Sequence, residues 1–167
     1  MVTVLGVSTR SNWRWRAGET TGEAVVFDMD GVLSNATGRQ HYLDPGRRKD
    51  WKGFFEAAGQ DALIEEVARL VELLDHSLVV VLLTARPVRI RDLTLEWLER
   101  HGLRWDLLVM RPDGDFDTSP EFKRRTVHEL REVDLDVRLA FEDDRRNLDM
   151  FHSEGVPCVY IHSGYYD

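Results

Sequence analysis

The chain has 167 residues and a formal net charge of −8, with 30 acidic against 22 basic side chains. This acidic excess argues against a general nucleic-acid coat protein, which needs a broad positive surface, but it allows an enzyme with a local basic site. The single cysteine, Cys158, excludes an internal disulfide and most cysteine-based metal sites. Because no apolar run is long enough to cross a bilayer and the N-terminus lacks the order of a secretory signal, we expect a cytoplasmic protein with no membrane partner.

The first 22 residues are expected to form an N-terminal arm or an extra strand, ahead of a main domain at residues 23–167. Residues 2–7 are apolar enough for a short strand, and residues 8–22 have the composition of a loop. In this loop Trp13 and Trp15 alternate with arginines. Two roles fit that pattern, namely indoles that pack on the domain or an arm whose rings stack on nucleic-acid bases.

Strands and helices are expected to alternate along the rest of the chain. Short apolar runs predict buried parallel strands at residues 23–28, 78–83, 107–110, 137–141 and 156–162. Apolar residues at helical spacing predict amphipathic helices at residues 60–75, 90–100, 122–132 and 147–154. The alternation indicates one α/β domain built on a central parallel sheet of about five strands, flanked by helices.

Chemically reactive side chains follow three of these strands. They are Asp28 and Asp30 after the first strand, Thr84 and Arg86 after the second, and Glu142, Asp143 and Asp144 after the fourth, with Lys123 at the start of the helix before it. In an open α/β sheet, ligands bind beyond the carboxyl ends of the strands. We therefore expect these side chains to line one site.

Carboxylates from two strand ends repel one another unless a cation lies between them. Mg²⁺ prefers oxygen ligands and suits a site that also holds a phosphate. A carboxylate such as Asp28 can attack phosphorus and form an aspartyl-phosphate, with Mg²⁺ and Lys123 cancelling the repulsion. Thr84 and the backbone N–H groups near Gly31 would hold the phosphate oxygens. Asp30 is placed to protonate the leaving oxygen and then to activate water.

Each of these segments has a plainer interpretation when it is taken alone. An Asp-x-Asp-Gly sequence also occurs in turns and calcium loops, and the residues around Thr84 would serve as a helix cap. Lys123 would ordinarily be a solvated lysine, and the acids at 142–144 a solvated helix start. What favours a catalytic site is that all four segments occur in the right order, after or beside apolar strands.

Together the segments resemble the four motifs of the haloacid dehalogenase-like (HAD) hydrolase superfamily, over residues 24 to about 162. The motifs correspond to residues 27–33, 83–86, 123 and 141–144. The resemblance implies a Rossmann-like HAD fold in which Asp28 is the nucleophile, Asp30 the general acid and base, and Thr84 and Lys123 bind the phosphoryl group. It also implies Mg²⁺ held by Asp28, the backbone carbonyl of Asp30, and Asp143, with Glu142 and Asp144 as neighbours supporting those ligands. A dehalogenase is disfavoured, because those enzymes lack the second aspartate that Asp30 provides.

Residues 34–61 and 111–121 are both too short for a large cap domain, so we expect a minimal cap and a site open to bulky substrates. Within the superfamily the chain most resembles the 3′-phosphatase domain of phage polynucleotide kinase-phosphatase, through Gly38-Arg39, Arg86 and residues 139–164. This resemblance implies that Arg39 and Arg86 contact the substrate, in addition to the backbone N–H expected at Gly31. The departures are Thr84 in place of a serine, Glu142 in place of an aspartate and Asp144 in place of a basic residue.

The expected function is therefore a Mg²⁺-dependent phosphomonoester hydrolase that removes 3′-phosphates from polynucleotide ends, as in nucleic-acid repair. No Gly-x-x-x-x-Gly-Lys phosphate loop is present, so we expect only the phosphatase half of such an enzyme. Two alternatives stay open: a nucleotidase or other small-molecule phosphatase, and a non-catalytic module that binds a metal or a phosphate. Arginines and lysines in the loops fit a nucleic-acid end, or simply neutralise surplus acid. His41, Tyr42 and Trp51 are candidates either for stacking on a base or for core packing.

Overall fold

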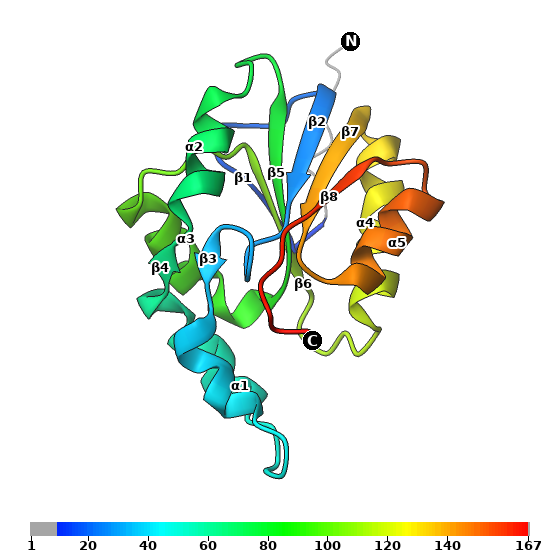
Figure 1. Ribbon diagram of the computed structural model, residues 1–167. Coiled ribbons are helices and arrows are strands. Elements are labelled where there is room, and N and C mark those ends of the chain that lie inside the picture. Colours follow the sequence, from blue (N-terminus) through cyan, green and yellow to red (C-terminus); the bar gives the residue numbers. More distant parts are fainter. Residues whose placement is uncertain (1–9, 167) are drawn as a thin grey trace.

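A six-stranded sheet forms the centre of the molecule, which the computed structural model describes over residues 10–166 (Figure 1). Its order is β1-β6-β5-β2-β7-β8, and every neighbouring pair is parallel except β1 and β6. The strands are β1 (Trp13–Trp15), β2 (Gly22–Phe27), β5 (Val79–Pro87), β6 (Leu107–Arg111), β7 (Leu135–Glu142) and β8 (Cys158–Tyr160). The predicted α/β fold is confirmed, with one antiparallel edge strand added to the five parallel ones.

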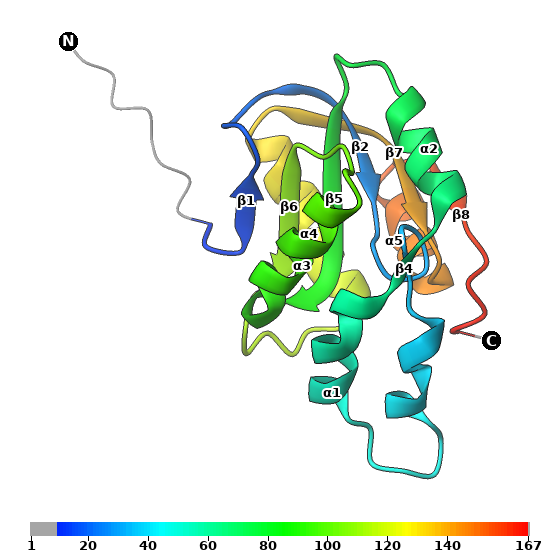
Figure 2. The same cartoon turned by 90° about the vertical axis from the view of Figure 1, so that its left-hand side faces the viewer.

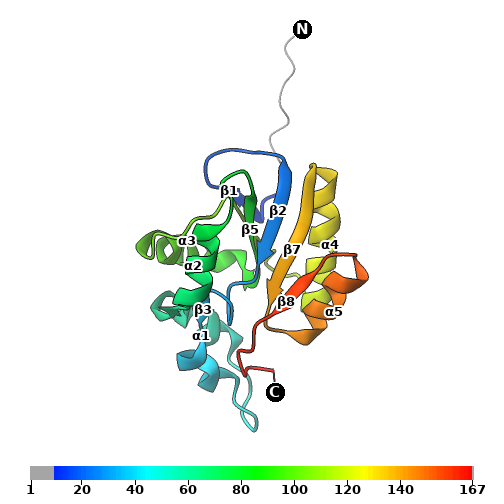
Figure 3. The ribbon, with the colours of Figure 1, turned by 45° about the horizontal axis from the view of Figure 1, so that its top comes forward.

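Helices cover both faces of this sheet (Figures 1 and 3). On one face lie α2 (Glu65–Leu73) and α3 (Arg91–Arg100), which follows the short η3 (Val88–Ile90). On the other face lie α4 (Ser119–Glu132) and α5 (Arg145–Ser153). No helix within residues 10–166 is both long and apolar enough to span a bilayer.

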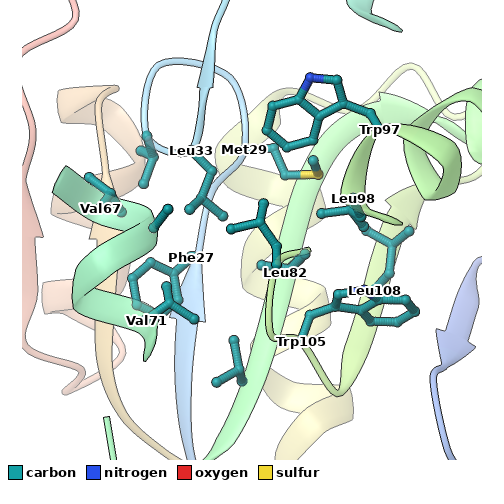
Figure 4. Close-up of a cluster of buried hydrophobic side chains, with 14 of the residues drawn as sticks. Phe27, Met29, Leu33, Val67, Val71, Leu82, Trp97, Leu98, Trp105 and Leu108 are labelled. Carbon is teal, nitrogen blue, oxygen red and sulfur yellow. The ribbon is translucent and has the colours of Figure 1, made fainter. Parts of the chain in front are cut away.

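The central strand β2 is apolar from Ala24 to Phe27, because both of its faces are buried over these residues. Val25 and Phe27 point into the core that α2 and α3 cover, and Ala24 and Val26 point into the core under α4 and α5. Figure 4 shows the first core, where side chains of α2 and α3 surround Phe27 and Leu82 of the sheet. Packing from two sides fixes the position of β2 between the two layers of helices. The position of the residues that follow the strand is fixed with it.

A small helical insert, residues 34–63, leaves the sheet after β2 and returns before α2. It contains β3 (Ser34–Asn35), η1 (Thr37–Leu43), α1 (Trp51–Glu56), η2 (Ala57–Gln60) and β4 (Ala62–Leu63). Because β3 pairs with β4 in antiparallel fashion, the insert leaves and returns at the same place. Its helices project beyond the carboxyl end of β2 (Figures 1 and 2). This is the minimal cap that the sequence predicted.

Several boundaries differ from the prediction. The second predicted strand continues to Pro87, because Pro87 pairs with Arg111 after an irregularity in the ladder. The first long helix begins at Glu65, since the residues before it form η2 and β4. The last strand is confined to Cys158–Tyr160.

The N-terminal segment contains a strand where a loop was expected. β1 pairs with β6, and Trp13 is only 7% exposed in the core under α4 and α5. Trp15 packs partly buried against the same core. The packing role predicted for these indoles is therefore correct, and Trp13 is not available to stack on a nucleic-acid base. The strand expected at residues 2–7 lies outside the described residues.

Replacing Trp13 with alanine should lower the free energy of unfolding by about 3 kcal/mol, because the change leaves a large cavity in the core. Urea denaturation measures this loss. Trp51→Ala is the matched control, since Trp51 is 48% exposed on α1 and should cost less than about 1 kcal/mol. Equal losses for the two variants would contradict the placement of β1 in the core.

Candidate active site

Asp28 lies directly after β2, between the ends of β5 and β7. Its backbone N–H donates to the carbonyl of Phe141 at 3.1 Å, so the parallel ladder with β7 still holds it. Lys123 of α4 reaches this point from the side, with Nζ 3.1 Å from Oδ1 of Asp28. The same ammonium group contacts Oε1 of Glu142, at the end of β7. Three of the predicted site residues therefore meet at one edge of the sheet.

The start of α4 explains why Lys123 faces the sheet. Thr118 is the N-cap, and its hydroxyl accepts a hydrogen bond from the N–H of Glu121, whose carboxylate accepts one from the N–H of Thr118. This capping box fixes the first residue of the helix. Lys123 then falls on the buried face and is 1% exposed, next to Phe122 in the core.

Lys123 stays charged although it is buried. Burial alone would lower the pKa of its ammonium group, but the carboxylates of Asp28 and Glu142 outweigh that effect and raise the pKa above its usual value. A fixed positive charge beside Asp28 is what a phosphate-binding lysine needs.

Asp28, Glu142 and Asp143 form an acidic group in which one oxygen of each carboxylate lies within 4.8 Å of the others. Both carboxylate oxygens of Asp143 are buried and without a hydrogen-bond partner in the described part of the chain. Burial and the charge of Asp28 raise the pKa of Glu142 and of Asp143. Buried polar atoms are normally satisfied, so an unpartnered carboxylate in an all-oxygen group fits a hard divalent cation such as Mg²⁺.

Gly31 makes close packing possible at this acidic group. Its φ is +83°, and a Cβ at this position would overlap the carboxylate of Asp143. Only glycine meets both requirements. Its N–H donates to the carbonyl of Ser34 at 2.8 Å and is not offered to a ligand. In this structure the turn uses that donor, and the absence of a side chain on Gly31 gives Asp143 its space. The expected contact of the Gly31 N–H with phosphate stays a prediction.

A second charged group surrounds Asp30. Arg39 and Arg86 both contact Oδ1 of Asp30, through Nη2 atoms at 2.5 and 2.6 Å. Asp61 accepts from Arg39 as well, with Nη2 2.7 Å from its Oδ2, and lies 3.6 Å from Nη2 of Arg86. Burial would raise the pKa of Asp30, but Arg86 and Arg39 outweigh it and lower that pKa.

The two arginines are not open to solvent. Arg39 is 2% exposed and Arg86 is fully buried, and both bind carboxylates. In this structure their donors face Asp30 and its neighbours, where they fix the carboxylate of Asp30 and favour its ionised form. Direct contact of Arg39 and Arg86 with the substrate stays a prediction.

Asp61 and Ser34 complete this group, and sequence reasoning missed both. Ser34 donates to Asp61 and accepts from Nη2 of Arg86 at 3.0 Å. The indole of Trp97 donates to the backbone carbonyl of Asp61 at 2.8 Å, which fixes the start of β4. Asp61 lies in no recognisable motif, so no feature of the sequence pointed to it. Its role follows from the structure, where two arginines buried near one aspartate need a further negative charge.

Thr84 and Asp144 have separate positions. Thr84 is buried near the end of β5, and its hydroxyl oxygen accepts from the N–H of Arg86 at 3.1 Å, so its hydroxyl proton remains to be donated. Asp144 is the N-cap of α5 and pairs with Arg146 at 2.7 Å. Of the three acids at the end of β7, Glu142 and Asp143 belong to the acidic group with Asp28, and Asp144 does not.

Known proteins share this fold. A family model described as the phosphatase domain of polynucleotide kinase PNKP matches residues 22–166. A chain in a structure of the Pnkp1/Rnl/Hen1 complex is 26% identical, with a TM-score of 0.72, over 95% of this chain and 50% of that one. A chain of a structure described as the Pnkp1/Rnl/Hen1 RNA repair complex is 25% identical, with a TM-score of 0.72, over 95% and 47%. The present chain thus spans about half the length of those it matches.

More distant proteins share the fold alone. A haloacid dehalogenase-like hydrolase from Streptococcus pneumoniae is 13% identical, with a TM-score of 0.57, over 82% of this chain and 83% of that one. A HAD-superfamily hydrolase from Geobacter sulfurreducens is 14% identical, with a TM-score of 0.55, over 83% and 86%.

Asp143→Asn should raise the free energy of unfolding of the metal-free protein by about 1 kcal/mol or more, because the buried carboxyl must either take up a proton or stay charged without a cationic partner, whereas an amide needs neither. The same change should abolish stabilisation by added Mg²⁺. Thermal unfolding in chelator and in Mg²⁺ measures both effects. Asp144→Asn is the control and should keep the Mg²⁺ response; an undiminished response in Asp143→Asn would rule out this acidic group as the metal site.

Asp61→Asn should lower the free energy of unfolding by about 3 kcal/mol, because two buried guanidinium groups then share one carboxylate. Guanidinium denaturation measures the loss. Asp44→Asn makes the same chemical change at an exposed position of the helical insert. If both variants lost equally little, Asp61 would not be needed to balance the arginines.

Proposed function

The chain belongs to the family of polynucleotide kinase PNKP phosphatase domains among the HAD phosphatases, and on that premise we propose that it removes 3′-phosphates from polynucleotide ends. The observation that carries the proposed chemistry is the contact of Asp28 with Lys123, beside an acidic group whose Asp143 has no partner. Asp28 would attack the phosphorus through a carboxylate oxygen, forming an aspartyl-phosphate while the bond to the leaving oxygen breaks.

The residues around Asp28 would have separate roles in this reaction. Lys123 binds Oδ1 of Asp28, which orients the carboxylate and places a positive charge where phosphate oxygens arrive. Thr84 has a hydroxyl proton to donate to one of those oxygens. Bound Mg²⁺, held by Asp28, Asp143 and the backbone carbonyl of Asp30, would neutralise further phosphate charge.

Asp30 is the proposed general acid and base. Arg39 and Arg86 both bind its Oδ1 and favour its ionised form. That form suits the second half of the reaction, in which a carboxylate takes a proton from the water that attacks the aspartyl-phosphate. The same contacts oppose the acid role in the first half. We propose that Asp30 nevertheless gives its proton to the leaving oxygen in the first half and regains a proton from the attacking water in the second.

Two observations support a polynucleotide end as the substrate. The matching family is that of polynucleotide kinase phosphatase domains, and a similar chain occurs in a complex described as an RNA repair complex. The helical insert is also small, so the carboxyl edge of the sheet has no large cap domain over it (Figure 2). A site of this kind accommodates the end of a polymer.

A nucleotidase is the second candidate, because the helical insert contains a cavity of ≈ 370 Å³. Its lining includes Thr37, His41, Tyr42 and Gln60. A volume of this order is typical of small-molecule sites. A free nucleotide held there would have aromatic and polar side chains around its base.

Phosphate release from matched oligonucleotides with a 3′- or a 5′-phosphate, and from free nucleotides, tests the proposal. With Mg²⁺ the 3′-phosphorylated strand should be the preferred substrate, and Asp28→Asn should reduce its turnover by more than about 10³-fold. Asp149→Asn, at an exposed position of α5, is the control. Rapid hydrolysis of nucleotides with the strand untouched would favour the nucleotidase. If no phosphomonoester were hydrolysed while Mg²⁺ bound, the domain would be a non-catalytic module.

A further inference from the structure

The tip of the helical insert carries basic side chains that take no part in the charge balance described above. Arg47, Arg48 and Lys49 are consecutive and exposed, and none of them forms an ion pair within residues 10–166. The protein as a whole has a net charge of −8, so three free cations in a row are a local exception. Such a segment attracts anions to one place on an otherwise repelling surface.

An exposed indole lies beside these cations. Trp51, at the start of α1, is 48% exposed, and Nζ of Lys49 lies 5.7 Å from the centre of its ring. The ring is held by two neighbours, since its centre is 5.8 Å from that of Phe54 and 5.9 Å from that of Phe55. Trp51 is therefore an oriented ring with a free surface, which costs little entropy when a planar group stacks on it.

The insert is anchored so that its tip has a defined place. Asp50 caps α1 by accepting from the N–H of Gly53 at 2.9 Å, and its own N–H donates to the carbonyl of Tyr42 at 2.9 Å. A Cβ on Gly53 would overlap the ring of Tyr42, so α1 and η1 are in close contact. At the base of the insert, the guanidinium of Arg39 lies 4.3 Å from the ring centre of Phe54. These contacts connect the tip, through η1 and α1, to the group around Asp30.

We propose that Arg47, Arg48, Lys49 and Trp51, here called the insert tip, bind a single-stranded nucleic acid upstream of the 3′-phosphate. The cations would contact backbone phosphates, and the indole would stack on one base. This proposal rests on the proposed function only for the position of the strand's 3′ end. A run of free cations next to an oriented aromatic ring is the combination that sequence-tolerant single-strand binding requires.

The distance from the catalytic site to the insert tip determines how many nucleotides a nucleic-acid strand needs in order to reach the tip. Arg39 contacts Asp30, and the four residues of η1 that follow Arg39 span about 8 Å at a rise of about 2 Å per residue. Residues 44–46 then lead on to the tip. Figures 1 and 2 show the insert extending away from the sheet in this direction. At about 3.4 Å per nucleotide, as in one strand of B-form DNA, the part of η1 after Arg39 already corresponds to more than about two nucleotides. A dinucleotide would not reach the tip.

Binding is measured by fluorescence anisotropy on the full chain carrying Asp28→Asn, so that turnover does not interfere. The probes are a 3′-phosphorylated dinucleotide and a 3′-phosphorylated single strand of about twelve nucleotides, each titrated over a range of salt concentrations. The longer strand should bind more tightly. Arg47→Ala/Arg48→Ala/Lys49→Ala should reduce the slope of log affinity against log salt by about 2, since each lost phosphate contact contributes about 0.7. Trp51→Ala should weaken binding of the longer strand about fivefold or more with little change in that slope.

Arg69→Ala/Arg138→Ala is the control, because both arginines are exposed but lie outside the insert and already pair with acids. It should leave the affinity for the longer strand unchanged. An unchanged salt slope in the triple variant, or equal affinity for the two probes, would overturn the proposal, as would equally strong competition by polyglutamate. If the tip variants lose binding but the protein with Asp28 intact leaves every 3′-phosphate in place, the insert tip stands as a strand-binding surface and the proposed function fails.

Discussion

Buried carboxylates at the ends of β2 and β7 must be balanced by positive charge, and this requirement organises the whole site. Around Asp30 the balance is complete, because Asp30 and Asp61 face two arginines. Around Asp28 it is not, because three carboxylates share only Lys123. With all groups ionised the deficit there is two charges, which is the charge of one divalent cation. Burial and the charge of Asp28 raise the pKa of Glu142 and Asp143, so the same deficit that favours a cation also favours proton uptake by these two carboxyls.

The two groups also differ in what holds them in place. Lys123 is positioned by a capped helix on one face of the sheet, and Arg39 comes from the insert on the other side of Asp28. Asp28 is therefore held by a residue of α4, whereas Asp30 is held by a residue of the insert. A change in the packing of α4 should act mainly on the nucleophile, whereas a change in the insert should act mainly on Asp30.

Much of the fold was predictable, since apolar runs and helical spacing are local signals. That Asp28, Glu142 and Asp143 would lie close together was predictable too, because parallel strands bring their carboxyl ends to one edge. Their catalytic roles stay predictions. The partners of the arginines were not. Asp61 and Ser34 lie in an insert without periodicity, and their contacts with Arg39 and Arg86 depend on how β3 pairs with β4.

Two further details depended on where elements end. Whether Glu142 or Asp144 joins the acidic group could not be read from three consecutive acids. β7 ends at Glu142 and Asp144 begins α5 as its N-cap, which separates them. β1 is three residues long, and an alternation that short does not distinguish a strand from a loop, so the burial of Trp13 was left open by the sequence.

The pairing of β3 with β4 bears on how such a domain can be remodelled. Because the insert leaves and returns at one point, its outer part can change in length or composition without disturbing the order of the sheet. Arg39 and Asp61 limit that freedom, since a transplanted loop lacking either one would leave an uncompensated buried charge next to Asp30. Phe54 and Ala58 limit it as well, because Arg39 contacts Phe54 and Ala58 is part of the core. The interchangeable unit is therefore the outer loop between η1 and α1. Exchanging that loop alone would change the surface beside the site while the groups around Asp28 and Asp30 stay in place.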